Sequence, residues 1–169
     1  MHYVSWDRSD RANLKLLAEA GPVELGVFTE DHAQVGDQQW QLVVSPESGA
    51  VASRGGEEIV RARGSLKRDK QIPVVVEGRG YQLVAETSKN WIIDDASGQK
   101  VGQFTSDHNG VRKAILEFEG ETTLPATDVA ALAWVSREVL EVRKMINSNA
   151  LIAFLVFLSV FVVIVFWMQ

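Results

Sequence analysis

Residues able to perform acid–base or metal chemistry are scattered along this chain. No two of the three histidines have the i, i+4 spacing that directs a pair of imidazoles at one metal: His2, His32 and His108. Asp107-His108 resembles an oriented base, but it adjoins the turn signal Asn109-Gly110 and has no activated nucleophile beside it. Asp94-Asp95 lacks the spacing of a calcium-binding loop and is typical of a turn. These residues predict solvated loops and turns.

The remaining catalytic signatures are not found in the sequence. There is no phosphate-binding loop, no nucleophile elbow and no cysteine for a disulfide or a thiolate zinc site. The net charge of −5 gives no basis for nucleic-acid binding. We therefore expect a non-enzyme with no cofactor and no metal, and no small-molecule substrate is identifiable.

One basic stretch runs from Arg54 to Lys70 and has a local charge of +3 in an acidic protein. Basic residues near an anionic cytoplasmic leaflet each contribute about 1 kcal/mol to attraction. A solvated loop is the simpler interpretation of such a run. The candidate headgroup-binding residues in the stretch are Arg61, Arg63, Lys67 and Arg68.

The element that would bring this stretch to a membrane is the C-terminal segment. Ala150 to Met168 are nineteen residues without charge, proline or glycine, and Ser159 is the one polar side chain among them. As a helix the segment would rise about 28 Å, close to the hydrocarbon thickness of a bilayer. The sequence therefore predicts a transmembrane anchor over residues 147–169.

The orientation is predicted from the flanking charges. Arg143 and Lys144 precede the apolar run, and the N-terminus has no stretch of signal-peptide length. The positive-inside rule then places the N-terminal domain in the cytoplasm of a single-pass, tail-anchored protein. The bacterial plasma membrane is the first choice and a eukaryotic endomembrane is the alternative.

The domain ahead of the anchor is expected to be β-rich over residues 22–146. Alternating apolar residues between turn signals predict about nine short antiparallel strands, which would form a barrel or a sandwich. Asn109-Gly110 predicts a tight hairpin before the last of them. Residues 1–21 are ambiguous, because Leu14, Leu16 and Leu17 suit a short helix or a strand.

The period then becomes helical over residues 127–146. Thr127 is the candidate N-cap, and Asp128 suits the positive end of the helix dipole. The segment 129–135, VAALAWV, is apolar almost all round and is expected to enter the domain. Arg137 and Glu141 lie away from the apolar stripe at a spacing that allows an ion pair. Residues 147–149 would be a polar hinge or part of one continuous helix.

The run WIIDDASGQKVGQF, a further strand and an apolar helix together resemble the tubby C-terminal-like superfamily, which includes the LURP-one-related and scramblase-like proteins. The similar region extends from Pro22 to about Met145. The resemblance implies a closed antiparallel barrel around a hydrophobic C-terminal helix, and a membrane-associated domain that binds phospholipid headgroups. Family barrels have twelve strands, where this sequence shows about nine unless the N-terminal segment adds more. The matching residues, besides VAALAWV, are Trp91, Ile93, Asp94, Gly98, Val101, Gly102 and Phe104.

Three hypotheses follow for function. The first is a non-catalytic, tail-anchored module that binds membrane lipid or an integral membrane protein. The second is a small accessory subunit of a membrane complex, held by its helix through bulky residues such as Phe154 and Phe157. The third is a membrane-bound enzyme with an unrecognised site.

Overall fold

The structure is a computed structural model of the chain, and it describes residues 1–19, 21–87, 90–105 and 115–167. Within these ranges it describes all side chains except those of residues 115, 145–151, 153 and 160–166. The predicted Asn109-Gly110 hairpin and the Asp107-His108 pair lie outside the described residues.

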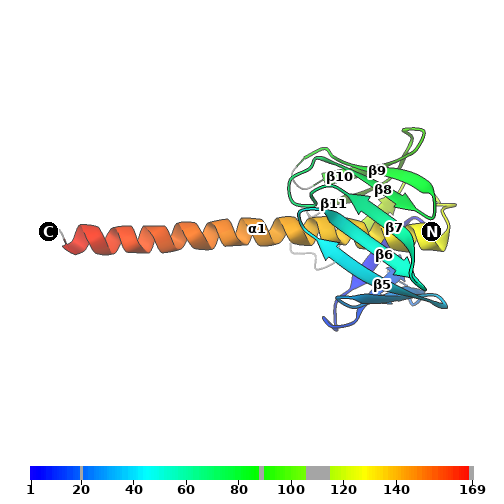
Figure 1. The fold of residues 1–169 in the computed structure, drawn as a ribbon, viewed down its shortest axis with the longest axis horizontal. Coiled ribbons are helices and arrows are strands. Elements are labelled where there is room, and N and C mark those ends of the chain that lie inside the picture. The colour runs from blue at the N-terminus through cyan, green and yellow to red at the C-terminus, as the bar shows by residue number, and fades with distance from the viewer. Residues whose placement is uncertain (20, 88–89, 106–114, 168–169) are drawn as a thin grey trace.

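Twelve antiparallel strands form a closed barrel in which each strand pairs with its neighbours in sequence (Figure 1). The barrel closes where β1 pairs with β12, with Tyr3 opposite Glu117 and Ser5 opposite Ile115. The strands are β1 Tyr3–Asp7, β2 Leu14–Ala18, β3 Glu24–Phe28, β4 His32–Val35, β5 Gln38–Ser45, β6 Gly49–Arg54, β7 Glu57–Arg63, β8 Gln71–Val76, β9 Arg79–Ala85, β10 Asn90–Asp95, β11 Lys100–Thr105 and β12 Ile115–Phe118.

The expectation of an antiparallel β-barrel is confirmed, and of the two arrangements left open the sandwich is wrong. The sequence predicts about nine or more strands and the barrel has twelve, of which β1, β2 and β4 are hard to recognise because they have only four or five residues each. Residues 1–21, set apart from the β-rich region by sequence, contribute β1 and β2 to the barrel. In β2 the adjacent Leu16 and Leu17 break the alternation, and the register with β3 shifts between them.

Turn-forming residues connect consecutive strands of the barrel. The Pro46 to Ser48 turn joins β5 to β6, and the turn after Asp95 joins β10 to β11. Gly49 has a φ of +115°, and a Cβ there would lie 2.0 Å from the Ala62 carbonyl oxygen, so only glycine fits. Pro73 is near the start of β8, before the hydrogen-bonded ladder with β7 begins at Val74.

The centre of the barrel is filled by the first part of the helix α1, Ala126–Trp167 (Figure 1). Every residue of the segment 129–135 is at most 1% exposed, which confirms that VAALAWV enters the domain. Trp134 is the largest of them, and Trp40 and Trp91 from the barrel wall are also fully buried. The helix is therefore the core on which the barrel closes.

The helix also corrects two expectations of detail. It begins at Ala126, and the amide of Val129 donates to the Pro125 carbonyl, so Thr127 lies inside the first turn and is not the N-cap. Arg137, expected on a solvent-facing side, is buried, because the barrel surrounds the helix there on all sides. Of the two possibilities for residues 147–149, the structure has the continuous helix.

Candidate functional site

The barrel has two ends with different chemistry, and the helix distinguishes them. We call the end near the start of α1 the entry end, marked by Asp128 and the Glu77-Gly78 turn. The end where α1 leaves is the exit end, formed by the Pro46 to Ser48 turn, the loop 64–70 and Arg143 (Figure 1). Each end is tied to the helix by an arginine.

At the exit end, Arg143 clamps the loop 64–70 onto the helix. Its Nε donates to the Leu66 carbonyl oxygen at 3.0 Å and its Nη2 to the Asp69 carbonyl oxygen at 2.6 Å. The guanidinium lies 4.7 Å from the centre of the Trp91 ring, in cation–π contact. Burial against this surface lowers the pKa of Arg143. The residue singled out for membrane topology is therefore also part of the barrel.

The clamp places two of the candidate basic residues where the helix emerges. Lys67 Nζ lies 3.3 Å from Glu47 Oε1, and Arg68 Nη2 lies 2.9 Å from Glu47 Oε2. We call Lys67 and Arg68 the basic fork. The Glu47 carboxylate lies between them. Hydrogen bonds from Arg68 and then Lys67 hold the pKa of Glu47 below its usual value. Arg143, which holds the loop that carries the fork, is seven residues before Ala150 and therefore lies about 10 Å along the helix from the predicted anchor.

The other two candidates lie on β7, away from the fork. Arg61 is half-buried and bonds through its Nε and Nη2 to the carboxylate of Glu58. Arg63 is exposed at the last position of β7, where the strand reaches the exit end. Lys144 is exposed on the helix beside Arg143. The structure thus brings Lys67, Arg68 and Arg63 to the exit end, and it places Arg61 on the side of the barrel.

At the entry end, an ion pair between the partly exposed Arg79 and the buried Asp128 holds the start of the helix, and we call this pair the latch. Asp128 is fully buried, and it accepts hydrogen bonds from Arg79 at 2.6 and 2.7 Å and from the Tyr81 hydroxyl. Arg79 also contacts Glu77, which pairs with Arg54 at 3.1 Å. The Asp128 carboxylate raises the pKa of Arg79, and burial raises the pKa of Tyr81. The sequence indicates only a helix-dipole role for Asp128 and does not show its contacts with Arg79 and Tyr81.

A second charged cluster lies along the helix between the buried segment 129–135 and Arg143. Arg137 Nη2 donates to Glu138 at 2.7 Å, Arg137 Nε lies 3.7 Å from Glu141, and Arg8 pairs with Glu141 at 3.3 Å. The Arg137–Glu141 pair confirms the contact expected from the spacing. Burial raises the pKa of Glu138. The guanidinium of Arg137 lies 5.2 Å from the centre of the Trp6 ring.

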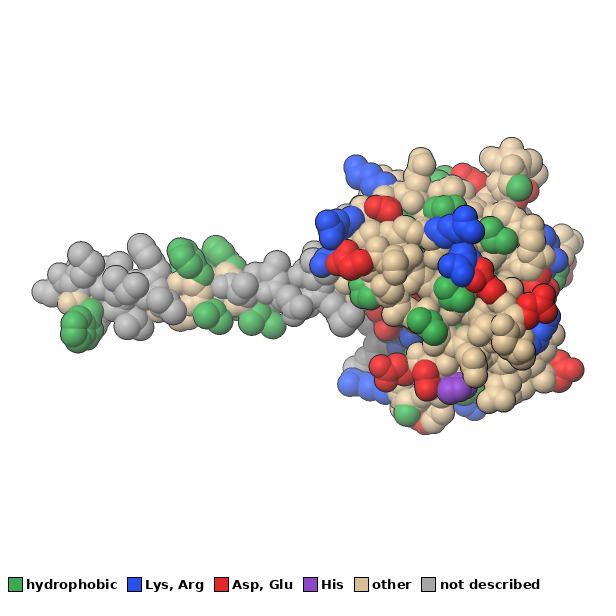
Figure 2. Space-filling view, in the orientation of Figure 1, with side chains coloured by type: hydrophobic (Ala, Val, Ile, Leu, Met, Phe, Trp, Pro, Cys, Tyr) green, Lys and Arg blue, Asp and Glu red, His purple; other side chains and the backbone are tan. Residues whose placement is uncertain are grey.

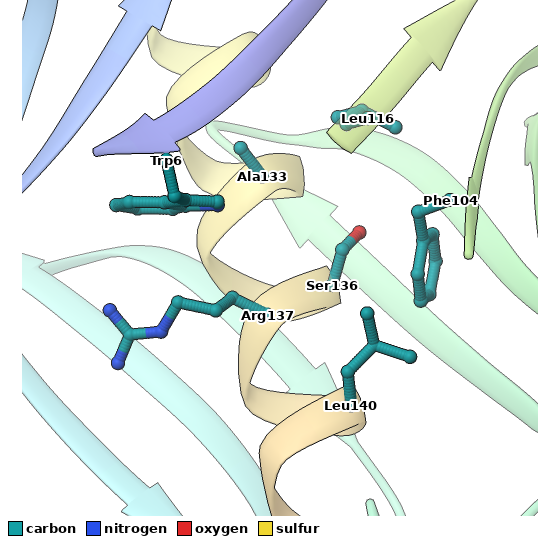
Figure 3. Close-up of a pocket in the computed structure, with 7 residues that line it drawn as sticks. All are labelled: Trp6, Phe104, Leu116, Ala133, Ser136, Arg137 and Leu140. Carbon is teal, nitrogen blue, oxygen red and sulfur yellow. The ribbon is translucent and has the colours of Figure 1, made fainter. Parts of the chain in front are cut away.

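Next to this cluster is a small cavity of about 10 Å³, shown in Figure 3. The Ser136 hydroxyl points into it, and no described residue accepts or donates a hydrogen bond there. The volume suffices for about one water molecule. Its lining is Trp6, Phe104, Leu116, Ala133, Ser136, Arg137 and Leu140. The cavity is too small for a metabolite or a lipid chain.

Beyond the barrel, from Phe154 to Leu158, the helix carries apolar side chains on every side. The five consecutive residues from Phe154 to Leu158 are each between 40% and 68% exposed. At 3.6 residues per turn, five consecutive positions cover the whole circumference of a helix. In Figure 2 this protruding helix is uncharged along its described length, whereas the globular part carries mixed charges, including some beside the helix exit. Within the residues that the structure describes, no helix is long and apolar enough to cross a membrane.

The described residues contain no group of three His, Asp or Glu side chains that could hold a metal ion. His32 Nδ1 contacts the neighbouring Asp31 at 2.8 Å on the surface. Asp95 accepts hydrogen bonds from the Ser97 and Gln99 amides, as expected of a turn residue. These polar residues are thus accounted for by local structure.

No protein-family model, no curated protein and no solved structure matches this chain.

Proposed function

We propose that this chain is a membrane-anchored, non-catalytic binding module, whose barrel presents its exit end to an anionic lipid surface. The apolar segment 150–168 is the transmembrane anchor, and the barrel lies on the cytoplasmic side, next to Arg143 and Lys144.

The observation that carries the proposal is the exposed, apolar circumference of α1 from Phe154 to Leu158, beyond the barrel. A helix that exposes Phe, Leu and Val on all sides is unfavourable in water, since burial of such side chains is worth about 1.5–3 kcal/mol each. The stretch without charge continues for nineteen residues in the sequence. A bilayer is the environment that accommodates this length and composition.

The position of the basic fork supports the lipid part of the proposal. Arg143 holds the loop 64–70 against the helix, so Lys67 and Arg68 lie on the side from which the anchor leaves. With Arg63 at the end of β7, three of the four candidate basic residues lie at the exit end. The binding partner would be the headgroups of the leaflet into which the chain is inserted.

The architecture also supports the proposed relationship to the tubby C-terminal-like superfamily, as a twelve-stranded barrel closed around a hydrophobic helix. Trp91 and Phe104, two residues of the resemblance, stack in the core with ring centres 5.8 Å apart. Because a fold does not determine a function, the lipid proposal rests on the exit end and the anchor.

Vesicle binding tests the headgroup contact separately from the anchor. A chain that ends at residue 149 is expected to bind vesicles containing anionic lipid at low salt and to dissociate as salt is raised. Replacing both Lys67 and Arg68 by Ala should weaken binding by up to about 25-fold, at no more than about 1 kcal/mol for each basic residue. The double variant Lys15→Ala and Lys100→Ala removes the same charge elsewhere and serves as the control. Equal binding to neutral and anionic vesicles would exclude headgroup recognition.

The alternative function is an accessory subunit of a membrane complex. The exposed, bulky Phe154 and Phe157 favour it, since in a bilayer these side chains could pack against a neighbouring helix as well as lipid. A stoichiometric partner that copurifies in mild detergent with the full chain, and is lost when the chain ends at residue 149, would support this function over lipid binding.

A further inference from the structure

The basic fork holds one carboxylate through both of its oxygen atoms. Lys67 contacts Oε1 of Glu47 and Arg68 contacts Oε2, so each cationic side chain binds a different oxygen of one anion. Two cationic donors on separate oxygens of one group is also an arrangement by which proteins hold a phosphate. The fork is therefore an anion site, and a residue of the chain itself occupies it.

The fork is fixed by its backbone. Leu66 is fully buried and anchors the loop in the core, and the amides of Arg68 and Asp69 both donate to the Ser65 carbonyl. The amide of Lys67 donates to the Pro46 carbonyl, which joins the loop to the turn that carries Glu47. The backbone that carries the two basic side chains is thus held independently of the ion pairs with Glu47.

Glu47 itself is well placed to leave. Its side chain is 53% exposed, and the residue lies in the hairpin turn between β5 and β6. Its side chain contacts Lys67 and Arg68 in the part of the chain that the structure describes. Rotation of this one side chain would free the fork without any change in the backbone.

We propose that Glu47 is a built-in competitor for the basic fork, so that the exit end engages the leaflet only when anionic phosphate groups are dense enough to displace it. This inference rests on the proposed function and adds regulation to it. The ligand class is a phosphate group of a lipid, which takes the place of the carboxylate between Lys67 and Arg68.

The relevant interactions are of similar size, which is why competition by Glu47 raises the fraction of anionic lipid needed to occupy the fork. An exposed ion pair changes an equilibrium constant by at most about fivefold. A basic residue near an anionic leaflet changes membrane affinity by about fivefold. Because the two pairs with Glu47 offset much of the gain from two lipid contacts, sparse anionic lipid would leave Glu47 in place.

The experiment uses the full chain reconstituted into neutral vesicles that contain increasing fractions of an anionic phosphodiester lipid. Energy transfer from the protein's tryptophans to a dilute, acyl-chain-labelled anionic lipid reports the enrichment of that lipid around the protein. In Glu47→Gln, the anionic fraction at half-maximal transfer is expected to fall by about two- to fivefold. The Glu57→Gln variant changes the net charge equally at the exposed start of β7 and should match the original chain.

The outcomes separate this inference from the function on which it rests. If Glu47→Gln leaves the half-maximal fraction unchanged or raises it, while Lys67→Ala with Arg68→Ala abolishes enrichment, then competition by Glu47 is wrong and headgroup binding stands. If no variant, including the original chain, responds to the anionic fraction, the headgroup proposal itself is overturned.

A further arm identifies the source of the phosphate. Millimolar inorganic phosphate is added to the same vesicles at constant ionic strength, with sulfate as the control. Retained enrichment of the labelled lipid supports the lipid headgroup as the ligand. Loss of enrichment with phosphate but not with sulfate would overturn the lipid assignment and make the fork a site for free phosphate.

Discussion

Arg143 combines a positive charge next to the proposed anchor with a directed clamp on the barrel, and one substitution separates the two. Arg143→Lys keeps the charge but loses the paired donors to Leu66 and Asp69 and the planar contact with Trp91. We expect the amides of Lys67, Arg68 and Asp69 to exchange about tenfold faster with deuterium. Lys144→Arg is the control. Unchanged exchange in Arg143→Lys would contradict the clamp.

The lowered pKa of Glu47 gives the fork a predictable dependence on pH. Above this pKa the carboxylate is charged and occupies the fork, and as the pH falls through it the protonated side chain releases Lys67 and Arg68. Enrichment of a phosphodiester lipid should therefore rise in the original chain below the usual pKa range of a glutamate. Glu47→Gln should lack this part of the rise. Parallel pH profiles for the two proteins would contradict the prediction.

The latch at the entry end makes a prediction about stability. Asp128→Asn removes the charge that pairs with Arg79 in a fully buried position. Because Arg79 is partly exposed and can be hydrated, we expect a loss of about 1–3 kcal/mol in the free energy of unfolding. Thermal unfolding of the full chain in detergent measures it. The same change at the exposed Asp37 is the control and should have little effect, whereas equal melting of the two variants would contradict the latch.

At the level of elements, the helix is the core of the barrel and the strands depend on it. A chain that ends at residue 125 lacks the buried side chains of α1 and would enclose an empty space the width of a helix. We expect it to be unfolded or aggregated. A chain that ends at residue 149 keeps these side chains and should show cooperative unfolding without detergent. Far-UV circular dichroism with thermal melting distinguishes the two, and a folded 1–125 chain would contradict the role of the helix.

The elements differ in how far the sequence predicts them. The hairpins from β5 to β11 have clear alternation and marked turns, and they lie where the pattern indicates. β4 has only Ala33 and Val35 facing the core, which is too short a pattern to recognise. The closure of β1 on β12 joins the two ends of the barrel, and no local pattern encodes such a distant pairing. For the same reason the burial of Arg137 was missed, since a helical wheel does not show a barrel wall.

In the candidate site, too, the sequence predicts some features, whereas others depend on contacts between distant parts of the chain. Composition alone indicates a basic stretch at residues 54–70, but the loop conformation decides which of its residues are at the exit end. The contact of Glu47 with Lys67 and Arg68 crosses about twenty residues of sequence, and the Asp128–Arg79 pair crosses about fifty. These pairings depend on strand register and on the depth of the helix in the barrel, so they follow from the fold and not from spacing.

For the molecule as a whole, the proposed function requires a rigid arrangement of barrel, exit end and anchor. One helix of 42 residues, about 63 Å long, runs from the latch at Asp128 through the barrel to Trp167. Because Arg79 and Arg143 hold it at both ends of the barrel, the anchor direction would fix which surface faces the membrane. The exit end would then meet the leaflet without any further ordering of the chain.

The most direct test of the central claim is extraction of the full chain from cell membranes at alkaline pH. The chain that ends at residue 149 is expected in the supernatant, because its remaining membrane contacts are electrostatic. The full chain, with its apolar helical segment, is expected to remain in the membrane pellet until detergent is added. Recovery of the full chain in the supernatant as a monodisperse protein would contradict the membrane-anchored account.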